Sequence, residues 1–348
     1  MIENKCIYFE KCGGCQIQGL TIQNYCTEKQ NQLLKILGDL PYDEMAPMQT
    51  FPSGIRRKAT LKVDYGCNIG FYKFKSNDVV PINKCPLLRD EINALIHPLK
   101  KLFKSFVKRS EGGIVITSAD NGLCIHFENI ALMPTDTPKI RTFAEEHNIL
   151  RITSGNVEVY KQAEPIIIFN GTKIPYPPKT FLQPTKESEQ KIVDAVLDVI
   201  RGKHFKTSAD IFCGLGLFSF YLRDFSDTVF AYDCDEDAIK HLAKIAHSNH
   251  FNIMAKSVDL FKHPLSTEKL NEFDFIVLDP PRDGAKAQCL KLRDATTKTV
   301  VYISCNPVAF TTDAKILING GYRIKKITPI DQFPNTTHLE LVTVFERD

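Results

Sequence analysis

The sequence predicts an α/β protein of two domains, in which a β-rich N-terminal domain precedes a doubly wound, mostly parallel sheet. The chain has 348 residues, whereas a single hydrophobic core rarely grows past about 250 to 300 residues. Beyond residue 178, strand-like and helix-like patterns alternate as in βαβ units. Before it, short apolar runs are separated by turns. With 43% hydrophobic and 24% charged residues, the composition excludes a disordered or fibrous chain.

The N-terminal half contains one predicted helix among short strands. Residues 21–37 place Leu33, Leu34 and Leu37 near helical spacing, and we expect this helix to be able to dock on the second domain. The predicted strands are 60–66, 113–117 and 157–160. The proline-rich residues 174–178 are stiff and poor in helix propensity. The domains are therefore predicted as 1–178 and 179–348.

The C-terminal half begins with a predicted helix over 187–200, and six strand-like runs follow. In a mostly parallel sheet, ligands bind beyond the carboxyl ends of the strands. The predicted strands are 208–212, 228–233, 273–279, 299–304, 322–330 and 339–345. Residues capable of chemistry should therefore be sought where these runs end.

A glycine loop follows the first of these strands. Gly214 and Gly216 let the backbone approach a ligand and turn into a helix, and Asp233, at the end of the second strand, can accept hydrogen bonds from ribose hydroxyls. A third glycine is missing from the position that the dinucleotide fingerprint requires. Together with the Asp-Pro-Pro-Arg run at 279–282, the loop resembles that of a class I methyltransferase that binds S-adenosylmethionine. The alternative is that the glycines only end a strand.

Cys305 ends a later strand, in the run Ser-Cys-Asn-Pro. A helix is predicted near Pro307, and its N-terminus would favour the thiolate form of Cys305. An isolated cysteine at a strand end is more often a buried filler. The surrounding motif favours a nucleophile instead.

Residues 331–340 read DQFPNTTHLE. With the Asp-Pro-Pro-Arg and Ser-Cys-Asn-Pro elements, they resemble the RNA uracil-C5 methyltransferases, and the resemblance spans almost the entire chain. It implies that Cys305 is the nucleophile that adds to C6 of uracil and that Glu340 is the base that removes the C5 proton. His338 is expected to be a structural residue of the motif.

The same resemblance implies the cofactor-binding residues. Gln183 is expected to face either the uracil or the cofactor. Asp279 would contact either uracil N3–H or the methionine part of the cofactor, and Asp259 would contact adenine unless it is a surface acid. The full implied set is Gln183, Phe212, Gly214, Gly216, Asp233, Asp259 and Asp279.

Three N-terminal cysteines have the spacing Cys-x5-Cys-x2-Cys. The resemblance adds a distant fourth ligand, Cys85, and implies a [4Fe-4S] cluster. A four-cysteine zinc site is the main alternative. Radical S-adenosylmethionine chemistry is disfavoured because its Cys-x3-Cys-x2-Cys spacing is absent. The expected cluster ligands are Cys6, Cys12, Cys15 and Cys85.

Charge and length suggest the partner. Residues 51–110 hold 13 Lys or Arg against four Asp or Glu, although the formal net charge is only +3, which points to a surface for RNA. The expected RNA contacts are Arg56, Arg57, Lys58, Lys62, Lys73, Lys75 and Lys84, with Tyr65, Phe71 and Tyr72 for stacking.

Many members of the family that this chain resembles carry an extra N-terminal OB-like module. In this chain Cys6 stands almost at the start, so that module is not expected. We therefore expect the shorter form, whose layout resembles that of the 23S rRNA enzymes, with tRNA as the alternative substrate. A non-catalytic iron-sulfur RNA-binding protein is the alternative from another class. The sequence lacks a signal peptide or membrane span, so a cytoplasmic monomer is expected.

Overall fold

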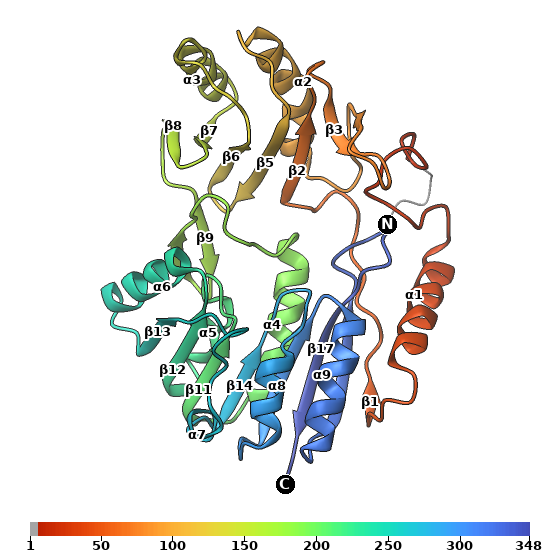
Figure 1. The fold of residues 1–348 in the computed structure, drawn as a ribbon, viewed down its shortest axis with the longest axis vertical. Helices are drawn as coiled ribbons and strands as arrows, with labels where there is room; N and C mark the ends of the chain where they lie inside the picture. The colour runs from red at the N-terminus through yellow and green to blue at the C-terminus, as the bar shows by residue number, and fades with distance from the viewer. Residues whose placement is uncertain (1–5) are drawn as a thin grey trace.

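The computed structural model describes residues 6–348 and arranges them around three sheets. The eight-stranded sheet occupies the lower part of Figure 1 and the seven-stranded sheet the upper part. A two-stranded hairpin, β9 (Ile166–Phe169) and β10 (Thr172–Pro175), lies in the chain between them. Its buried residues Ile167, Phe169 and Ile174 join the hydrophobic core of the lower sheet.

The eight-stranded sheet is the doubly wound sheet that the sequence predicts, with β1 and β13 as two strands that were not predicted. Neighbouring strands are parallel except for the two antiparallel pairs made by β17. The chain therefore enters β17 at the edge of the sheet where β15 ends. In spatial order the strands are β1 (Glu44–Met45), β16 (Arg323–Ile330), β17 (Glu340–Glu346), β15 (Thr299–Ser304), β14 (Phe275–Leu278), β11 (Phe205–Ile211), β12 (Ser226–Asp233) and β13 (Ile253–Ser257).

Helices cover both faces of this sheet, and each face has its own hydrophobic core. The first face is covered by α4 (Lys186–Ile200), α5 (Leu217–Leu222) and α6 (Glu236–Ser248). The second is covered by α1 (Ile22–Leu37), α7 (Thr267–Leu270), α8 (Lys286–Arg293) and α9 (Pro307–Asn319).

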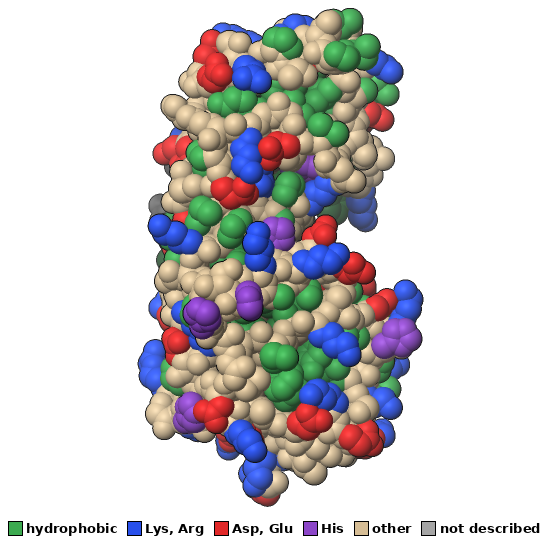
Figure 2. Space-filling view, turned by 90° about the vertical axis from the view of Figure 1, so that its left-hand side faces the viewer, with side chains coloured by type: hydrophobic (Ala, Val, Ile, Leu, Met, Phe, Trp, Pro, Cys, Tyr) green, Lys and Arg blue, Asp and Glu red, His purple; other side chains and the backbone are tan. Residues whose placement is uncertain are grey.

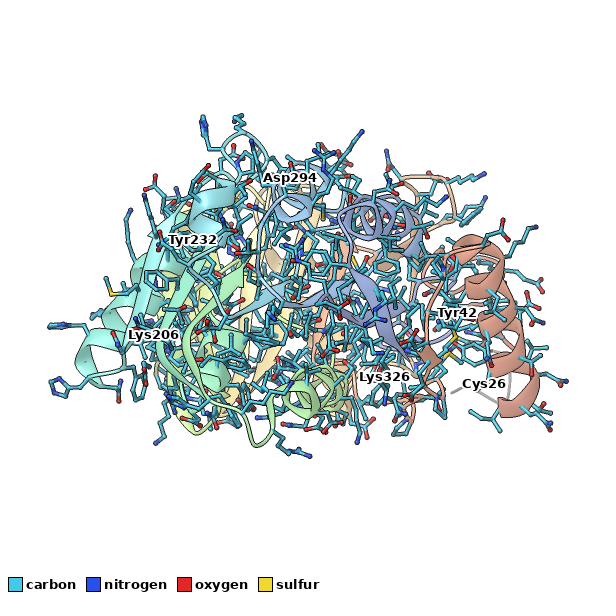
Figure 3. All side chains as sticks on the ribbon, turned by 90° about the horizontal axis from the view of Figure 1, so that it is seen from below. Cys26, Tyr42, Lys206, Tyr232, Asp294 and Lys326 are labelled. Atoms are coloured by element: carbon cyan, nitrogen blue, oxygen red, sulfur yellow. The ribbon has the colours of Figure 1, made fainter. Side chains whose placement is uncertain are left out.

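The N-terminal helix α1 packs beside α9, far from its neighbours in the sequence (Figure 1). Leu33 and Leu37, one turn apart, are buried in the core of the second face. Seen from below, α1 with Cys26 lies at the opposite end of the sheet from Tyr232 of β12 (Figure 3). Strand β1 continues this attachment, because it pairs with β16.

The seven-stranded sheet has a separate core under α2 (Asp90–Ser105) and α3 (Thr137–Glu146). These two helices correct the prediction of a single helix in this half. The interior Pro98 and three lysines hid the helical spacing of the buried residues of α2. In spatial order the strands are β4 (Val79–Pro81), β3 (Ile69–Tyr72), β2 (Lys58–Val63), β5 (Gly112–Ala119), β6 (Gly122–Glu128), β7 (Ile149–Ser154) and β8 (Val157–Lys161). Within residues 6–348, none of the helices is long and apolar enough to cross a membrane.

Candidate functional site

The glycine loop lies between β11 and α5, at the carboxyl edge of the sheet. Gly214 has a φ of 52°, and a Cβ added there would meet no atom within 4 Å, so the backbone faces open space. Gly216 has a φ of 85°, and an added Cβ would lie 2.7 Å from Leu242. Both positions therefore require glycine, the first for conformation and the second also for packing against α6.

Asp233 ends β12 beside this loop and shapes it. Its carboxylate accepts hydrogen bonds from the backbone N–H of Gly214 at 2.9 Å and from that of Asp235 at 2.9 Å. Because a carboxylate has about four acceptor positions, Asp233 can still accept hydrogen bonds from a ligand. This is the position expected of a ribose-binding acid.

Two further carboxylates lie close to Asp233. Asp279, directly after β14, is half-buried, and Asp210, in β11, is buried. Burial, followed by the negative charges of Asp210 and Asp233, raises the pKa of Asp279 to about 7. Burial is also the main cause that raises the pKa of Asp210 to about 7, against hydrogen bonds donated by Ser219. The site thus concentrates negative charge where a cationic ligand would relieve it.

The predicted adenine-side residues lie near each other. Phe212 follows β11 with a φ of 65°, and its ring centroid is 5.6 Å from that of Phe261. Asp259 lies in the turn that carries Phe261, where its carboxylate accepts from the backbone N–H of Phe261 and pairs with Lys262 at 2.9 Å. The Asp259 carboxylate is thus already engaged by its own turn.

Cys305 and Glu340 lie side by side at the edge where β15 ends and β17 begins. The antiparallel register of β15 and β17 runs as far as the pair of Ser304 and Leu341, and Cys305 and Glu340 are the next residues of the two segments beyond that pair. The charge of Glu340 is among the causes that raise the pKa of Cys305, so the two side chains are close. Cys305 is half-buried and Glu340 is buried.

The surroundings of Cys305 favour the thiol over the thiolate. Helix α9 begins at Pro307, as predicted, with Asn306 as its N-cap. Nevertheless, burial, then the charges of Glu340 and Asp279, raise the pKa of Cys305 to about 11, while Arg282 lowers it. The helix N-terminus that was expected to favour the thiolate is therefore present, but burial and the two neighbouring carboxylates act in the opposite direction.

Gln183 is held on the segment that joins the two domains. The Arg57 guanidinium donates from Nε to the Gln183 carbonyl at 3.0 Å, and the Arg57 backbone N–H donates to the Pro184 carbonyl at 2.8 Å. The Gln183 side chain is buried, and its Oε1 has no hydrogen-bond partner among the described residues. A buried acceptor without a partner indicates a place for a ligand.

Arg57 and Lys58 of the basic run 56–58 have structural roles, which counts against the expectation that these two residues contact RNA. Arg57 is 1% exposed and forms an ion pair with Glu189 of α4. Lys58 donates to Tyr176 at 3.0 Å and to the Thr180 carbonyl at 2.7 Å. These cations therefore join the N-terminal sheet to the linking segment and to α4, and they are unavailable for phosphate.

The other predicted RNA contacts remain at the surface. Lys73 and Lys75 are exposed at the turn between β3 and β4, together with Tyr72 and Phe74. Lys84 and Tyr65 are also exposed, whereas Phe71 packs partly against the core. Figure 2 shows a hollow between the upper and lower parts of the molecule, with Lys, Arg and His side chains as well as Asp and Glu side chains beside it. The turn between β3 and β4 therefore still offers a basic and aromatic surface that does not include Arg57.

The four predicted ligand cysteines line one cavity of about 310 Å³. Cys12 and Cys15 lie in the N-terminal loop. Cys85 is held from α2 by Asn93, whose Oδ1 accepts its backbone N–H at 2.8 Å and whose Nδ2 donates to its carbonyl at 3.0 Å. Burial raises the pKa of Cys15 to about 12. Across residues 6–348, no group of three or more His, Cys, Asp or Glu side chains forms a ready site for a metal ion. The cysteines thus surround a space rather than a single point.

Two residues of this edge had been given no role from the sequence. Gln332 donates a hydrogen bond to Glu340, and Arg282 lies near the Cys305 thiol and 3.5 Å from Nδ1 of His338. Both belong to motifs that were recognised, but their side-chain directions depend on the packing of β14, β15 and β17. Only their proximity to the predicted residues could have singled them out.

Comparison with known proteins places this site in a family. Residues 169–348 match the model of the tRNA (uracil-5-)-methyltransferase family. An RNA methyltransferase of Agrobacterium fabrum is 32% identical, over 97% of this chain and 82% of that protein. The 23S rRNA (uracil(1939)-C(5))-methyltransferase RlmD of Vibrio vulnificus is 29% identical, over 99% of this chain and 82% of the relative.

A solved structure has the same fold. The tRNA (uracil-54, C5)-methyltransferase of Pyrococcus abyssi, in complex with S-adenosyl-L-homocysteine, superimposes with a TM-score of 0.77 at 23% identity. The match covers 96% of this chain and 85% of that one. The chain belongs to the family of S-adenosylmethionine-dependent RNA uracil-C5 methyltransferases.

Proposed function

We propose that this enzyme methylates C5 of one uridine in RNA, that 23S rRNA is the favoured substrate, and that Cys305 and Glu340 perform the chemistry. The observation that carries this proposal is that Cys305 and Glu340 directly adjoin the last residue pair of β15 and β17, Ser304 and Leu341, at the carboxyl edge of the sheet. The choice of RNA is supported by the RlmD relative. The tRNA alternative is supported by the name of the family model and by the fold of the Pyrococcus abyssi enzyme.

The cofactor site is proposed to consist of the glycine loop and the strand-end carboxylates. S-adenosylmethionine supplies the methyl group when it is bound. Gly214 offers backbone next to open space, and Asp233 accepts hydrogen bonds from the ribose. Asp279 and Gln183 contact either the uracil or the methionine part, and the unpartnered Gln183 oxygen fits either role. Phe212 and Asp259 flank the adenine.

The roles of Cys305 and Glu340 follow from the reactivity of uracil. C5 is too weak a nucleophile to accept a methyl group directly. The sulfur of Cys305 therefore adds to C6, which makes C5 carbanion-like and places charge on O4. After methylation, C5 carries both the methyl group and its original hydrogen. Glu340 removes that hydrogen as a proton, and the sulfur then leaves C6. The target uridine must be turned out of its stack to reach this edge.

The raised pKa of Cys305 fits a thiol that is activated only in the complex. Its proton has a nearby acceptor in the carboxylate of Asp279, one of the two groups whose charge raises its pKa, and a transfer to Asp279 leaves Glu340 able to accept the C5 proton. A cationic cofactor among Asp210, Asp233 and Asp279 would reduce the negative charge around the sulfur. We expect cofactor binding to lower the pKa of Cys305.

We further propose that Cys6, Cys12, Cys15 and Cys85 hold a [4Fe-4S] cluster. Support comes from the shared cavity of about 310 Å³. Anaerobic reconstitution should give four iron and four sulfide per chain with visible absorbance, and Cys85→Ser should lose both. One zinc per chain without sulfide would refute the cluster.

RNA is proposed to bind along the exposed turn between β3 and β4 and the hollow seen in Figure 2. Exposed Lys73 and Lys75 supply positive charge, and exposed Tyr72 and Phe74 supply stacking surfaces. The N-terminal loop that contains Cys12 is hydrogen-bonded to this turn, because the Gly13 N–H donates to the Tyr72 carbonyl at 2.8 Å.

Tritium release tests the reaction and its substrate. Transcripts of 23S rRNA and of tRNA carrying tritium at uracil C5 are incubated with the enzyme and S-adenosylmethionine. We expect wild-type enzyme to release tritium from one uridine of 23S rRNA, and Glu340→Gln to form a covalent protein–RNA adduct without release. Release from tRNA alone would show that tRNA, the alternative, is the substrate. Release from neither RNA would refute the proposed function.

A further inference from the structure

The Gln332 side chain reaches Glu340 from the interior of the catalytic domain. Gln332 lies in the loop between β16 and β17 and is 2% exposed. Its Nε2 donates a hydrogen bond to Oε2 of Glu340. Its Oε1 accepts from the Ser188 hydroxyl at 3.1 Å. Both ends of the amide are therefore engaged by buried partners, which fixes the direction of the donor.

The N-terminus of α4 holds Ser188 in place. Thr185 is the N-cap, and its Oγ1 accepts the backbone N–H of Ser188 at 3.0 Å. The Thr185 hydroxyl also donates to the Ser188 hydroxyl at 2.7 Å. The carbonyl of Thr185, 3.2 Å from Ser188 Oγ, is a second acceptor for the Ser188 proton. Ser188 is fully buried, so the helix cap orients the hydroxyl that faces Gln332.

The charges around Glu340 favour its protonated form. Asp279, beyond β14, and the Cys305 sulfur, beyond β15, face it, while Arg282 lies near Cys305. Burial and the charge of Asp279 raise the pKa of Glu340 well above its usual range, and the hydrogen bond from Gln332 opposes this rise. A base must be unprotonated before it accepts a proton. Gln332 is thus the group that favours the reactive state.

We infer that Gln332 is a positioning residue for the reaction: oriented by Ser188, its amide holds Glu340 as a carboxylate ready to accept the C5 proton. This inference rests on the proposed role of Glu340 as the base.

Single-turnover tritium release, measured against pH, tests the inference. The variants are Gln332→Leu, which removes the donor, and Ser188→Ala, which removes the orienting hydroxyl. The matched control is Gln288→Leu. Gln288 is also buried, but both ends of its amide bond to the backbone of Leu265, at 2.9 and 3.2 Å. All proteins are assayed with the transcript that the wild-type enzyme methylates.

We expect the fall in release rate at low pH to move upward by about one to two pH units in Gln332→Leu, because a hydrogen bond to a charged group is lost. Ser188→Ala should move it in the same direction by less, and Gln288→Leu should leave it in place. A purely structural role would lower rate or stability in all three variants without moving the profile.

Failure of the inference and failure of the proposed function give different results. If Glu340→Gln releases tritium normally, Glu340 is not the base, and both its proposed role and the inference about Gln332 are refuted. If Glu340→Gln traps the adduct but Gln332→Leu and Ser188→Ala keep the wild-type pH profile, only the role of Gln332 is overturned. If Gln332→Leu does not fold, the profile of Ser188→Ala alone decides.

Discussion

A buried ion pair between distant parts of the chain attaches α1 to the loop that leads into Glu340. Lys29 of α1 and Asp331 each have a side chain 1% exposed and pair directly. Lys29 also donates to the His338 carbonyl at 2.7 Å, and Tyr25 donates to Asp331 Oδ2 at 2.8 Å. Burial lowers the pKa of Lys29 while Asp331 raises it, so the ammonium depends on its partner.

Removing one partner should be costly. Asp331→Leu leaves a buried ammonium, and Lys29→Met leaves a buried carboxylate, so each should lower the free energy of unfolding by about 3–5 kcal/mol. The double variant removes both charges. It leaves the Tyr25 hydroxyl without its acceptor, which costs about 1–3 kcal/mol. The double variant should therefore be more stable than the sum of the two single losses implies, by at least about 3 kcal/mol.

Urea unfolding of the full chain, followed by far-ultraviolet circular dichroism, measures these values. The matched control is Lys35→Met, an exposed lysine of the same helix, which should change stability by less than about 0.5 kcal/mol. Single losses under about 1 kcal/mol, or losses that simply add in the double variant, would refute the buried, coupled pair.

Three further predictions concern the site. With its pKa near 11 instead of 9.0, Cys305 should have about a hundredfold smaller thiolate fraction at pH 7 than an ordinary thiol. The rate of its alkylation by iodoacetamide, followed by peptide mass spectrometry, should rise about tenfold per pH unit up to pH 10. A plateau of this rate below pH 8 would contradict the prediction. Gly214→Ala should abolish S-adenosylhomocysteine binding in calorimetry, whereas Gly202→Ala, at another positive φ with open space, should not; equal affinities would remove the loop from the cofactor site. Lys73→Gln with Lys75→Gln should reduce the slope of log affinity for RNA against log salt by up to about two, and an unchanged slope would exclude this turn from the RNA surface.

The features visible in the sequence were those set by local pattern. Strand 299–304 was predicted with the bounds it has, and α9 begins at the predicted Pro307. The apolar runs and the glycine loop specify the doubly wound sheet, because each is read within a few residues. The edge that carries Cys305 followed from the rule that ligands bind beyond strand ends.

What was not predicted depends on contacts between distant residues. Lys29 and Asp331 are 302 positions apart, and nothing near either one indicates a buried pair. The basic run around Arg57 suggested an RNA surface. Arg57 is instead buried against Glu189 of α4, and this burial depends on how distant elements pack, which the local sequence does not show. The raised pKa of Cys305 likewise required knowing that β17 runs antiparallel and brings Glu340 alongside.

The most direct measurement of the central claim uses RNA that contains 5-fluorouridine in place of uridine. Fluorine at C5 cannot be removed as a proton, so the sulfur that has added to C6 stays attached. We predict a denaturant-stable protein–RNA adduct that depends on S-adenosylmethionine and maps to the peptide containing Cys305. The adduct should be absent from Cys305→Ala. An adduct on another cysteine, or none with any RNA that the enzyme methylates, would contradict nucleophilic attack by Cys305.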